Sequence, residues 1–561
     1  MSLDGDQLDV IQSSSTSKVV VVAQPGAGKT RVVVERAIEL ARADPDSDVL
    51  VISFSNAAVG AVRDRAAGAR LLNLWVGTLD ALALRLVHAA GVSPARGFDA
   101  IVQQAINLCV PKQADLGVVS HILVDEAQDL DSLRGKFLAA ILQAAPSAGA
   151  TVVGDPLQKI YDFEADSDTG AFLDDLLRDA TWSQKVLPGS YRAKSQGAHR
   201  AVALRRSLST LIGDYLGELP EASMEDMVAR ASASSKSIGI LTRTNAEAAM
   251  LSMEMGERGL PTGVTAKAEA AGVTSLVALT LGQGPAQVTK QDFMALTEDR
   301  TDGEILWSYL RRLAGTSTTK LRVTDVVTAL ALAQAAPAAL RSDPYRRTIS
   351  TVHRAKGLEF LNTYLASPTG WRRLDDSREQ WERLAYVAVT RAERFSFRLQ
   401  NWETGRRWML HQRTGRSLLP AGRFGIGGIS LDARDALTRE VLPEKFRRGQ
   451  DWLQAWTTPM LVEARLNRAR SDSQVPIYDL LAADETLIGR TSASFGQDLA
   501  SCIGRRKDSP ARWPELGPVT VDGVLTDFRP QAPADMPVGR HGLWLAPRLS
   551  GGVRLLWKES K

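Results

Sequence analysis

Two apolar runs in the first 130 residues end abruptly in polar, turn-forming sequence. Val19 to Val22 lead directly into AQPGAGKT at 23–30, and Ile122 to Val124 lead into DEAQD at 125–129. Short continuous apolar runs bounded by turns are typical of strands buried on both faces of a parallel sheet. The segment 31–43 is compatible with a helix, so the first run predicts a strand, a glycine-rich turn and a helix.

Further along the chain the pattern changes. Residues 98–108, 303–314 and 323–336 read as helices. The last 90 residues predict a small α+β module with strands at 475–481, 486–491 and 519–528, a strand pair at 543–557, and a helix at 495–503.

The glycine-rich turn carries the chemistry of a phosphate-binding loop. Gly26 and Gly28 allow the backbone to curl so that its N–H groups face an anion. The helix N-terminus behind the loop adds partial positive charge. Lys29 is expected to reach the β- and γ-phosphates and Thr30 to hold Mg²⁺. Ala23 stands where the usual pattern begins with glycine.

The acidic end of the second run supplies the complementary groups. Asp125 is expected to hold Mg²⁺, and Glu126 to orient and deprotonate an attacking water. Ligands sit at the carboxyl ends of strands in open α/β sheets, which is where both residues fall. Together with the loop about a hundred residues upstream, this pair predicts nucleotide hydrolysis.

Composition changes this picture only slightly. The 561 residues predict several domains, and no apolar run is long enough for a membrane span. Two distant cysteines exclude a disulfide framework, and the acidic N-terminus lacks a signal-peptide core, so a cytoplasmic protein is expected. Residues 396–561 carry 25 Lys and Arg against 18 Asp and Glu. This mildly basic part is compatible either with nucleic-acid contact or with a solvated surface.

Ten segments, in order, resemble the motifs of superfamily 1 DNA helicases of the UvrD/Rep/PcrA type. They are LDGDQLDVIQ at 3–12, AQPGAGKTR at 23–31, VLVISFSNAAVGAVRDR at 49–65, VGTLDALALRL at 76–86, DEAQD at 125–129, VVGDPLQKIYDF at 152–163, LPGSYR at 187–192, IGILTRTNAEA at 238–248, TVHRAKGLEF at 351–360 and ERLAYVAVTRA at 382–392. The resemblance implies an α/β fold with two RecA-like P-loop NTPase core domains, parallel sheets and small helical inserts.

The resemblance also implies a site for ATP and Mg²⁺. Its catalytic residues would be Lys29, Glu126, Gln158, Arg192 and Arg391, with both arginines supplied by the second core domain. Gln7 would read the adenine edge, Tyr191 would stack on the base and Glu359 would meet the ribose. The loop contacts would come from Ala23, Gln24, Pro25, Gly26, Ala27, Gly28, Lys29, Thr30 and Arg31.

The expected partner is single-stranded DNA or a junction of single and double strand. By resemblance, Phe54 and Phe163 would stack on bases, or else pack in the core. Asn56, Thr78, His353 and Arg354 would contact the strand. Three departures remove positive charge or a donor from this path: no lysine follows Asn56, Asp80 stands where relatives usually carry histidine, and Glu164 follows Phe163. The ATPase residues are complete, whereas the DNA path is modified.

The expected domain organisation follows the motifs. Core domain 1A would span 1–180 with a reduced insert at about 87–120, and core domain 2A would span 181–260 and 346–400. A reduced helical insert would occupy 261–345, a linker or helical segment 401–470, and a small basic α+β module 471–561.

Three functions remain open at this stage. The first is an ATP-dependent translocase or helicase, 3′-to-5′ by family resemblance, in repair, replication or anti-phage defence. The second is a helicase-like ATPase subunit of a larger assembly, similar to the Gabija defence complex or to RNA polymerase remodellers, with a protein partner bound through the C-terminal region or the reduced inserts. The third, an inactive binding module, is disfavoured by the intact Lys29, Asp125, Glu126 and Arg391.

Overall fold

The computed structural model divides into two compact units. It describes residues 3–53, 59, 71, 73–109, 118–160, 171–232, 237–265, 273–282, 284–297, 303–315, 320–332, 347–368, 371, 377–400, 409–421, 425–433, 435–437, 443–503, 513–529 and 541–557. Unit 1 comprises Met1–Glu218 and Arg372–Ser396, and unit 2 comprises Leu219–Trp371 and Phe397–Lys561.

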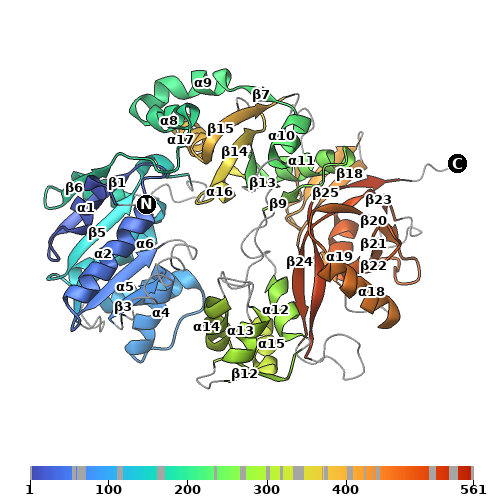
Figure 1. Cartoon of the computed structure of the whole chain (residues 1–561), viewed down its shortest axis with the longest axis horizontal. Helices are drawn as coiled ribbons and strands as arrows, with labels where there is room; N and C mark the ends of the chain where they lie inside the picture. Colours follow the sequence, from blue (N-terminus) through green and yellow to red (C-terminus); the bar gives the residue numbers. More distant parts are fainter. Residues whose placement is uncertain are drawn as a thin grey trace. The chain divides into compact units, whose positions relative to one another are not determined.

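Unit 1 is built on a parallel sheet, which Figure 1 shows with its covering helices. Its described strands run in the order β3-β2-β4-β5-β1-β6. The strands are β1 (Lys18–Ala23), β2 (Asp48–Ser53), β3 (Leu74–Gly77), β4 (Val119–Asp125), β5 (Gly149–Gly154) and β6 (Ser183–Leu187). β6 lies beyond the boundary expected at residue 180, yet it pairs with β1 and so completes the first sheet.

Helices cover both faces of this sheet, which explains why its strands read as continuous apolar runs. Val19 and Val21 pack with residues of α1 and α2, whereas Val20 packs with residues of α4, α5 and α6. The helices and 3-10 turns of unit 1 are α1 (Gly5–Ile11), α2 (Lys29–Ala43), α4 (Leu79–Ala89), α5 (Phe98–Cys109), η1 (Ala127–Asp129), α6 (Ser132–Ala144), η2 (Pro156–Gln158), α7 (Ala171–Arg178), α8 (Gln196–Ala203), η3 (Leu204–Ser207), α9 (Leu208–Glu218) and α17 (Arg378–Val389).

A second parallel sheet has the order β7-β15-β14-β8-β13-β9 among the described strands. Its strands are β7 (Glu221–Ala222), β8 (Ile238–Thr242), β9 (Gly263–Val264), β13 (Arg347–Thr351), β14 (Phe360–Leu365) and β15 (Ala392–Leu399), accompanied by α10 (Met224–Ser232), α11 (Asn245–Glu257) and α16 (Val352–Ala355). The unit boundary falls within β15. Two parallel α/β sheets of this kind confirm the expected pair of RecA-like cores.

The segment between β9 and β13 folds mainly as helices, as its composition predicted. It contains β10 (Val273–Thr274), α12 (Ser275–Leu281), β11 (Gln287–Thr289), α13 (Lys290–Leu296), α14 (Gly303–Leu313), β12 (Lys320–Arg322) and α15 (Val323–Leu332). Phe293 and Trp307 meet in its core with ring centroids 5.4 Å apart. β10 leaves the segment to pair with β24.

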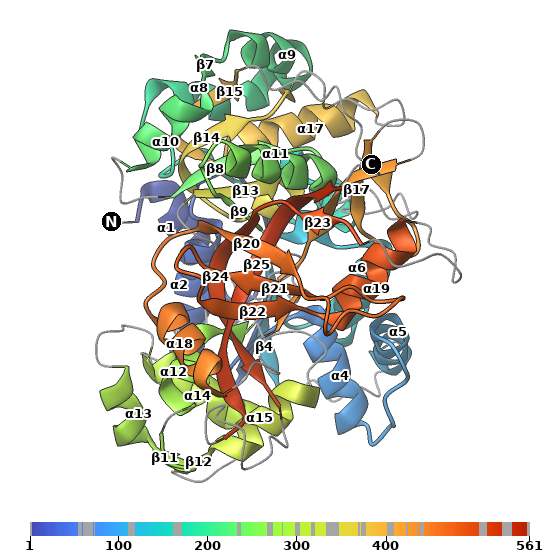
Figure 2. The ribbon, with the colours of Figure 1, turned by 90° about the vertical axis from the view of Figure 1, so that its right-hand side faces the viewer.

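The C-terminal part forms one large antiparallel sheet (Figure 2). Its described strands are β16 (Met409–Leu410), β17 (Ser417–Ala421), β18 (Gly425–Leu431), β19 (Ala436–Leu437), β20 (Met460–Leu466), β21 (Tyr478–Leu481), β22 (Leu487–Thr491), β23 (Glu515–Leu516), β24 (Val519–Phe528) and β25 (Leu543–Leu556), with helices α18 (Pro443–Gln454) and α19 (Ala493–Cys502). Residues 401–470, expected as a linker or helical segment, therefore supply strands to this sheet as well as α18.

The strand pair expected at 543–557 is wrong, because these residues form the single strand β25. Its first part pairs with β24 up to Ser550, and its last part pairs with β18 from Gly551 onward. Gly551 has φ +86°, and a Cβ there would lie 2.1 Å from Ser252 Oγ of α11. Gly551 thus marks a change of pairing partner and a close approach of α11 rather than a hairpin turn.

α11 and the C-terminal sheet are joined by further contacts within unit 2. Arg554 forms an ion pair with Glu257, and the Val264 backbone N–H donates to Ser550 Oγ at 3.2 Å. A Cβ at Gly256 would lie 3.2 Å from Leu461. The predicted module 471–561 is thus packed against the second core domain, and its strands belong to the same sheet as those of residues 409–466.

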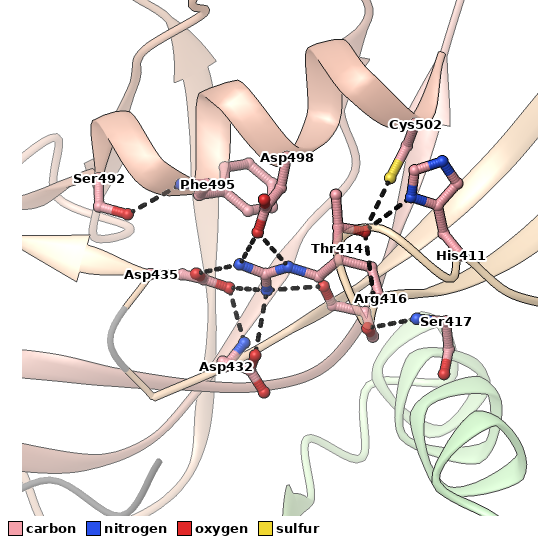
Figure 3. A network of polar contacts seen from close by, with 11 residues as sticks. His411, Thr414, Arg416, Ser417, Asp432, Asp435, Ser492, Phe495, Asp498 and Cys502 are labelled. Atoms are coloured by element: carbon pink, nitrogen blue, oxygen red, sulfur yellow. Dashed lines mark hydrogen bonds and ion pairs between the residues drawn. The ribbon is translucent and has the colours of Figure 1, made fainter. Parts of the chain in front are cut away.

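A buried arginine fastens the strands and helix of this sheet (Figure 3). Arg416 NH1 and NH2 donate to the two carboxylate oxygens of Asp435 at 2.6 and 2.7 Å, and its Nε donates to Asp498 at 2.9 Å. Its guanidinium also lies 5.6 Å from the centre of the Phe495 ring. Burial raises the pKa of Asp435, whereas Arg416 lowers it.

None of the helices in the described ranges is both long enough and apolar enough to span a membrane.

Candidate nucleotide site

The loop between β1 and α2 has the geometry of an anion cradle. Gly26 and Gly28 adopt φ of 77° and 80°, the left-handed region that glycine occupies without strain. A Cβ at Gly26 would lie 2.5 Å from Arg192 Cβ, so no larger residue fits there. Gly28 is the N-cap of α2 and contributes no side-chain cap. The two glycines of the loop and the N-terminus of α2 therefore suit a bound phosphate.

Two short contacts join the loop to the end of β4. Lys29 Nζ lies 3.9 Å from Glu126 Oε1, and Thr30 Oγ1 donates to Asp125 Oδ2 at 2.9 Å. Burial and the neighbouring Glu126 raise the pKa of Asp125 to about 7, while Lys29 and Thr30 act in the opposite direction. A divalent cation would favour the ionised form of this carboxylate.

Glu126 departs from the strand in a conformation that a non-glycine residue adopts rarely. Its φ is 56° and its ψ is 42°, immediately after β4 ends at Asp125. This left-handed turn is held from both sides: the Glu126 backbone N–H donates to Asp125 Oδ1 at 3.0 Å, and Gln128 Nε2 donates to Glu126 Oε2. Backbone strain of this kind clusters at functional sites, where the surrounding structure over-determines it.

A chain of buried polar groups leads from Glu126 to Arg391. Gln128 Oε1 accepts the Asp155 backbone N–H at 2.9 Å, and Asp155 Oδ2 accepts Gln158 Nε2 at 2.8 Å. Gln158 Oε1 in turn accepts Arg391 NH2 at 3.1 Å. The members come from β4–η1, β5–η2 and the turn between α17 and β15, so three chain segments far apart in the sequence meet in unit 1.

The segment after β6 lies against the loop. Ser190 Oγ donates to the Pro25 carbonyl at 2.9 Å, the Tyr191 backbone N–H donates to the Gly26 carbonyl at 2.8 Å, and Arg192 NH1 donates to the Thr390 carbonyl at 3.1 Å. Segment 181–218 and the turn that bears Arg391 thus both group with the first sheet.

The N-terminal helix also reaches this loop. Gln7 is buried and its Nε2 donates to the Ala27 carbonyl at 3.0 Å. The Tyr191 hydroxyl donates to the Asp4 carboxylate, a contact that raises the pKa of Tyr191 to about 12. Of the remaining expected loop residues, Ala23 ends β1, the Gln24 backbone N–H donates to the Leu187 carbonyl at 3.2 Å, and Arg31 lies in the first turn of α2.

The other expected site residues are placed elsewhere. Thr78 caps α4, its Oγ1 accepting the Ala81 backbone N–H at 3.2 Å. Glu359, His353 and Arg354 belong to unit 2, where Arg354 NH1 donates to the Thr265 carbonyl at 2.6 Å and the Glu359 carbonyl accepts from Ser237 Oγ. Phe54, Asn56 and Phe163 lie outside the described residues.

Asp80 has a structural explanation. It accepts a hydrogen bond from Arg134 NH2 of α6 at 2.7 Å, and Arg134 also pairs with Asp131. The acidic residue at this motif position therefore joins α4 to α6.

Sequence reasoning did not single out three members of the site: Gln128, Asp155 and Arg205. The first two stand inside the quoted segments DEAQD and VVGDPLQKIYDF, where their polarity next to apolar strands was an available signal. Arg205 lies in no motif, and only the tertiary fold brings it to Asp155, at 2.7 Å.

The residues present fit Mg²⁺ and a nucleoside triphosphate. Within the described ranges, no three His, Cys, Asp or Glu side chains form a metal cage. Thr30 and Asp125 provide only a partial oxygen set, which is the arrangement Mg²⁺ uses when substrate phosphates supply further ligands.

Comparison with protein families agrees with this geometry. A model described as an AAA domain matches residues 7–164, and a model of the UvrD-like helicase C-terminal domain matches residues 304–395. Together these two matches support a UvrD-like helicase of superfamily 1. They also support an ATP-driven helicase or translocase that binds nucleic acid.

Other comparisons add less. The crystal structure of Pif1 helicase from Candida albicans is similar over 71% of this chain and 95% of that chain, with 13% identity and a TM-score of 0.35. A likeness at this TM-score carries no argument, so the UvrD-like assignment rests on the family models and the two sheets. Comparison with curated proteins returned no match.

Proposed function

We propose that this UvrD-like helicase hydrolyses ATP with Mg²⁺ and couples the reaction to movement along single-stranded DNA, 3′-to-5′ by family resemblance. The observation that carries the proposal is the left-handed Glu126, 3.9 Å from Lys29 and next to the Thr30–Asp125 pair. A carboxylate beside a phosphate-binding lysine is placed to take a proton from an attacking water.

Each residue has a distinct task in this proposal. Lys29 and the loop N–H groups bind the phosphates, while bound Mg²⁺ neutralises part of their charge. Glu126 accepts the proton of water, and Gln128 fixes its orientation. Arg192 and Arg391 supply positive charge for the γ-phosphate in the transition state, where arginines are worth about 10³–10⁵ in rate. Gln7 and Tyr191 are proposed to recognise the base, and Glu359 the ribose.

The proposed DNA contacts are Phe54, Asn56, Thr78, Phe163, His353 and Arg354. Stacking of bases on aromatic rings would contribute about 1–3 kcal/mol per base without sequence preference. Repair, replication and anti-phage defence are the pathways in which such a motor fits.

One observation favours the second candidate, an ATPase subunit of a larger assembly. Asp80 replaces a residue expected on the DNA path and is engaged by Arg134. A partner protein bound through the C-terminal region or the inserts would then complete the DNA groove.

ATP turnover with Mg²⁺, measured with and without single-stranded DNA, tests the proposal. We expect DNA to raise turnover. Glu126→Gln should lower kcat by about 10²–10⁴-fold while the Kd for a fluorescent ATP analogue stays unchanged, because the amide cannot accept the proton. Glu39→Gln, on an exposed position of α2, is the matched control.

Each other outcome is informative. A wild-type chain without ATP turnover contradicts the hydrolase. Turnover that DNA does not raise favours the assembly subunit. Equal kcat for Glu126→Gln and the wild type would remove Glu126 from its proposed role.

A further inference from the structure

Asp155 is a carboxylate with unusually complete burial at the edge of the nucleotide site. It follows β5, has no exposed surface, and caps η2. Its Oδ2 accepts Gln158 Nε2 at 2.8 Å, while its Oδ1 accepts Leu157 N at 3.2 Å and Arg205 NH1 at 2.7 Å. An ionised carboxylate removed from water requires a cation or several donors to remain charged.

Arg205 provides that cation from outside the helicase motifs. It lies in η3, between α8 and α9, and its side chain is 20% exposed. It is also close enough to the buried Tyr386 of α17 to lower the pKa of that hydroxyl, against the rise caused by burial. Arg205 therefore contacts both the β5–η2 turn and α17, the helix that ends just before Arg391.

The hydrogen bond to Asp155 fixes the orientation of the Gln158 amide. The Gln158 amide can donate only from its nitrogen, so donation to Asp155 turns its oxygen toward Arg391 NH2. If Asp155 lost its charge or rotated, the amide would lose this constraint, and Arg391 would lose a partner that orients it. A small misplacement of a catalytic group can cost about 10²-fold in rate.

We propose that Arg205 is a positioning residue for ATP turnover: its ion pair with Asp155 fixes Gln158 and, through Gln158, the guanidinium of Arg391. This inference rests on the proposed ATPase activity. It assigns a task to a residue that touches neither the phosphate-binding loop nor Glu126 in the contacts described.

The test compares Arg205→Gln with Arg206→Gln, the neighbouring exposed arginine. We expect Arg205→Gln to lower kcat per nucleotide-binding site by about 10²-fold, with the Kd for an ATP analogue within about threefold of wild type. Arg206→Gln should match the wild type. Arg205→Lys keeps the charge but lacks the planar fork, so an intermediate loss of about tenfold is expected.

A double-mutant cycle separates positioning from general destabilisation. If Arg205 acts through Asp155, Asp155→Asn combined with Arg205→Gln should lose no more kcat than the more damaging single variant. Multiplicative losses would overturn the proposal. A wild-type kcat in folded Arg205→Gln would also overturn it; if that variant does not fold, a wild-type kcat in Arg205→Lys would do so. A wild type without ATP turnover would overturn the proposed function and this inference together.

Discussion

Unit 1 and unit 2 each bury an arginine in a polar network, and the two networks differ in what they hold. Both terminal nitrogens of Arg416 donate to the carboxylate of Asp435, and Asp498 accepts its Nε. Arg391 NH2 instead donates to the neutral amide of Gln158, and its Nε donates to the Val387 carbonyl. A guanidinium that binds a carboxylate through two nitrogens makes a strong charge-assisted contact and fixes the chain segments around it. A hydrogen bond to a neutral amide is weaker, so it can be exchanged for a phosphate at a lower cost in free energy. Burial alone therefore does not show whether an arginine has a function, and the groups that accept its hydrogen bonds must be considered as well.

The largest expected effect concerns Arg391. Arg391→Ala should lower kcat for ATP by about 10³–10⁵-fold, because charge on the γ-phosphate loses its guanidinium. Steady-state turnover at saturating ATP measures this. Arg378→Ala is the control: Arg378 begins α17, the helix that precedes Arg391, its side chain is 67% exposed, and no contact among the described residues joins it to the nucleotide site. If both variants retained full kcat, the contrast with Arg416 would disappear.

Arg416 should affect stability and leave nucleotide binding alone. Arg416→Met leaves the Asp435 carboxylate buried without its cation, which should lower the free energy of unfolding of unit 2 by about 3–5 kcal/mol. Urea unfolding followed by tryptophan fluorescence measures the change. Arg465→Met, which removes exposed pairs with Glu463 and Glu485, should leave the free energy of unfolding close to the wild-type value. A lower ATP affinity in Arg416→Met would contradict the structural role.

A third network shows that location in unit 1 is not what makes an arginine functional. Arg36 is fully buried under α1, donating to Thr151 Oγ1 and to the carbonyls of Val10, Ile11, Ser13 and Ser14. His121 shares the Thr151 hydroxyl at 2.9 Å. Burial, then the charge of Arg36, lowers the pKa of His121 from 6.5 to about 4.

This histidine predicts a pH dependence of stability. Between pH 6.5 and 4 the unfolded chain binds a proton that folded His121 does not, so stability is complete above pH 6.5 and falls as the pH drops toward 4, by about 3 kcal/mol. Urea midpoints at pH 7.5 and pH 5 test it. His121→Gln should flatten this slope, while His88→Gln, at an exposed position of α4, should keep it. An unchanged slope in His121→Gln would place the pH dependence elsewhere.

The local part of the site was predictable from sequence. The valine run predicts a strand, and the loop with its two glycines and lysine predicts a turn before a helix. The acidic residues of DEAQD directly follow an apolar run, so they are expected at the end of a strand. The structure brings Lys29, Thr30, Asp125 and Glu126 together, as this local pattern implied; their roles stay predictions.

The non-local part was not predictable. Asp155 and Arg205 are 50 residues apart in separate elements, and no spacing rule connects them. The partner change in β25 also depends on β18 and α11, which the glycines alone do not reveal. Strand pairing and buried ion pairs depend on tertiary context that local pattern does not contain.

The packing of α11 on β25 restricts how this chain can be divided. Ser252 of α11 fits only because position 551 lacks a side chain. Glu257 of the same helix forms an ion pair with Arg554, which is almost 300 residues further along the sequence. Removing the residues beyond 400 would expose one side of α11, a helix of the second core domain, to solvent. The residues beyond 400 are thus part of the packing of the second core domain and not an independent domain. Exchanging them between proteins would require α11 to be exchanged with them.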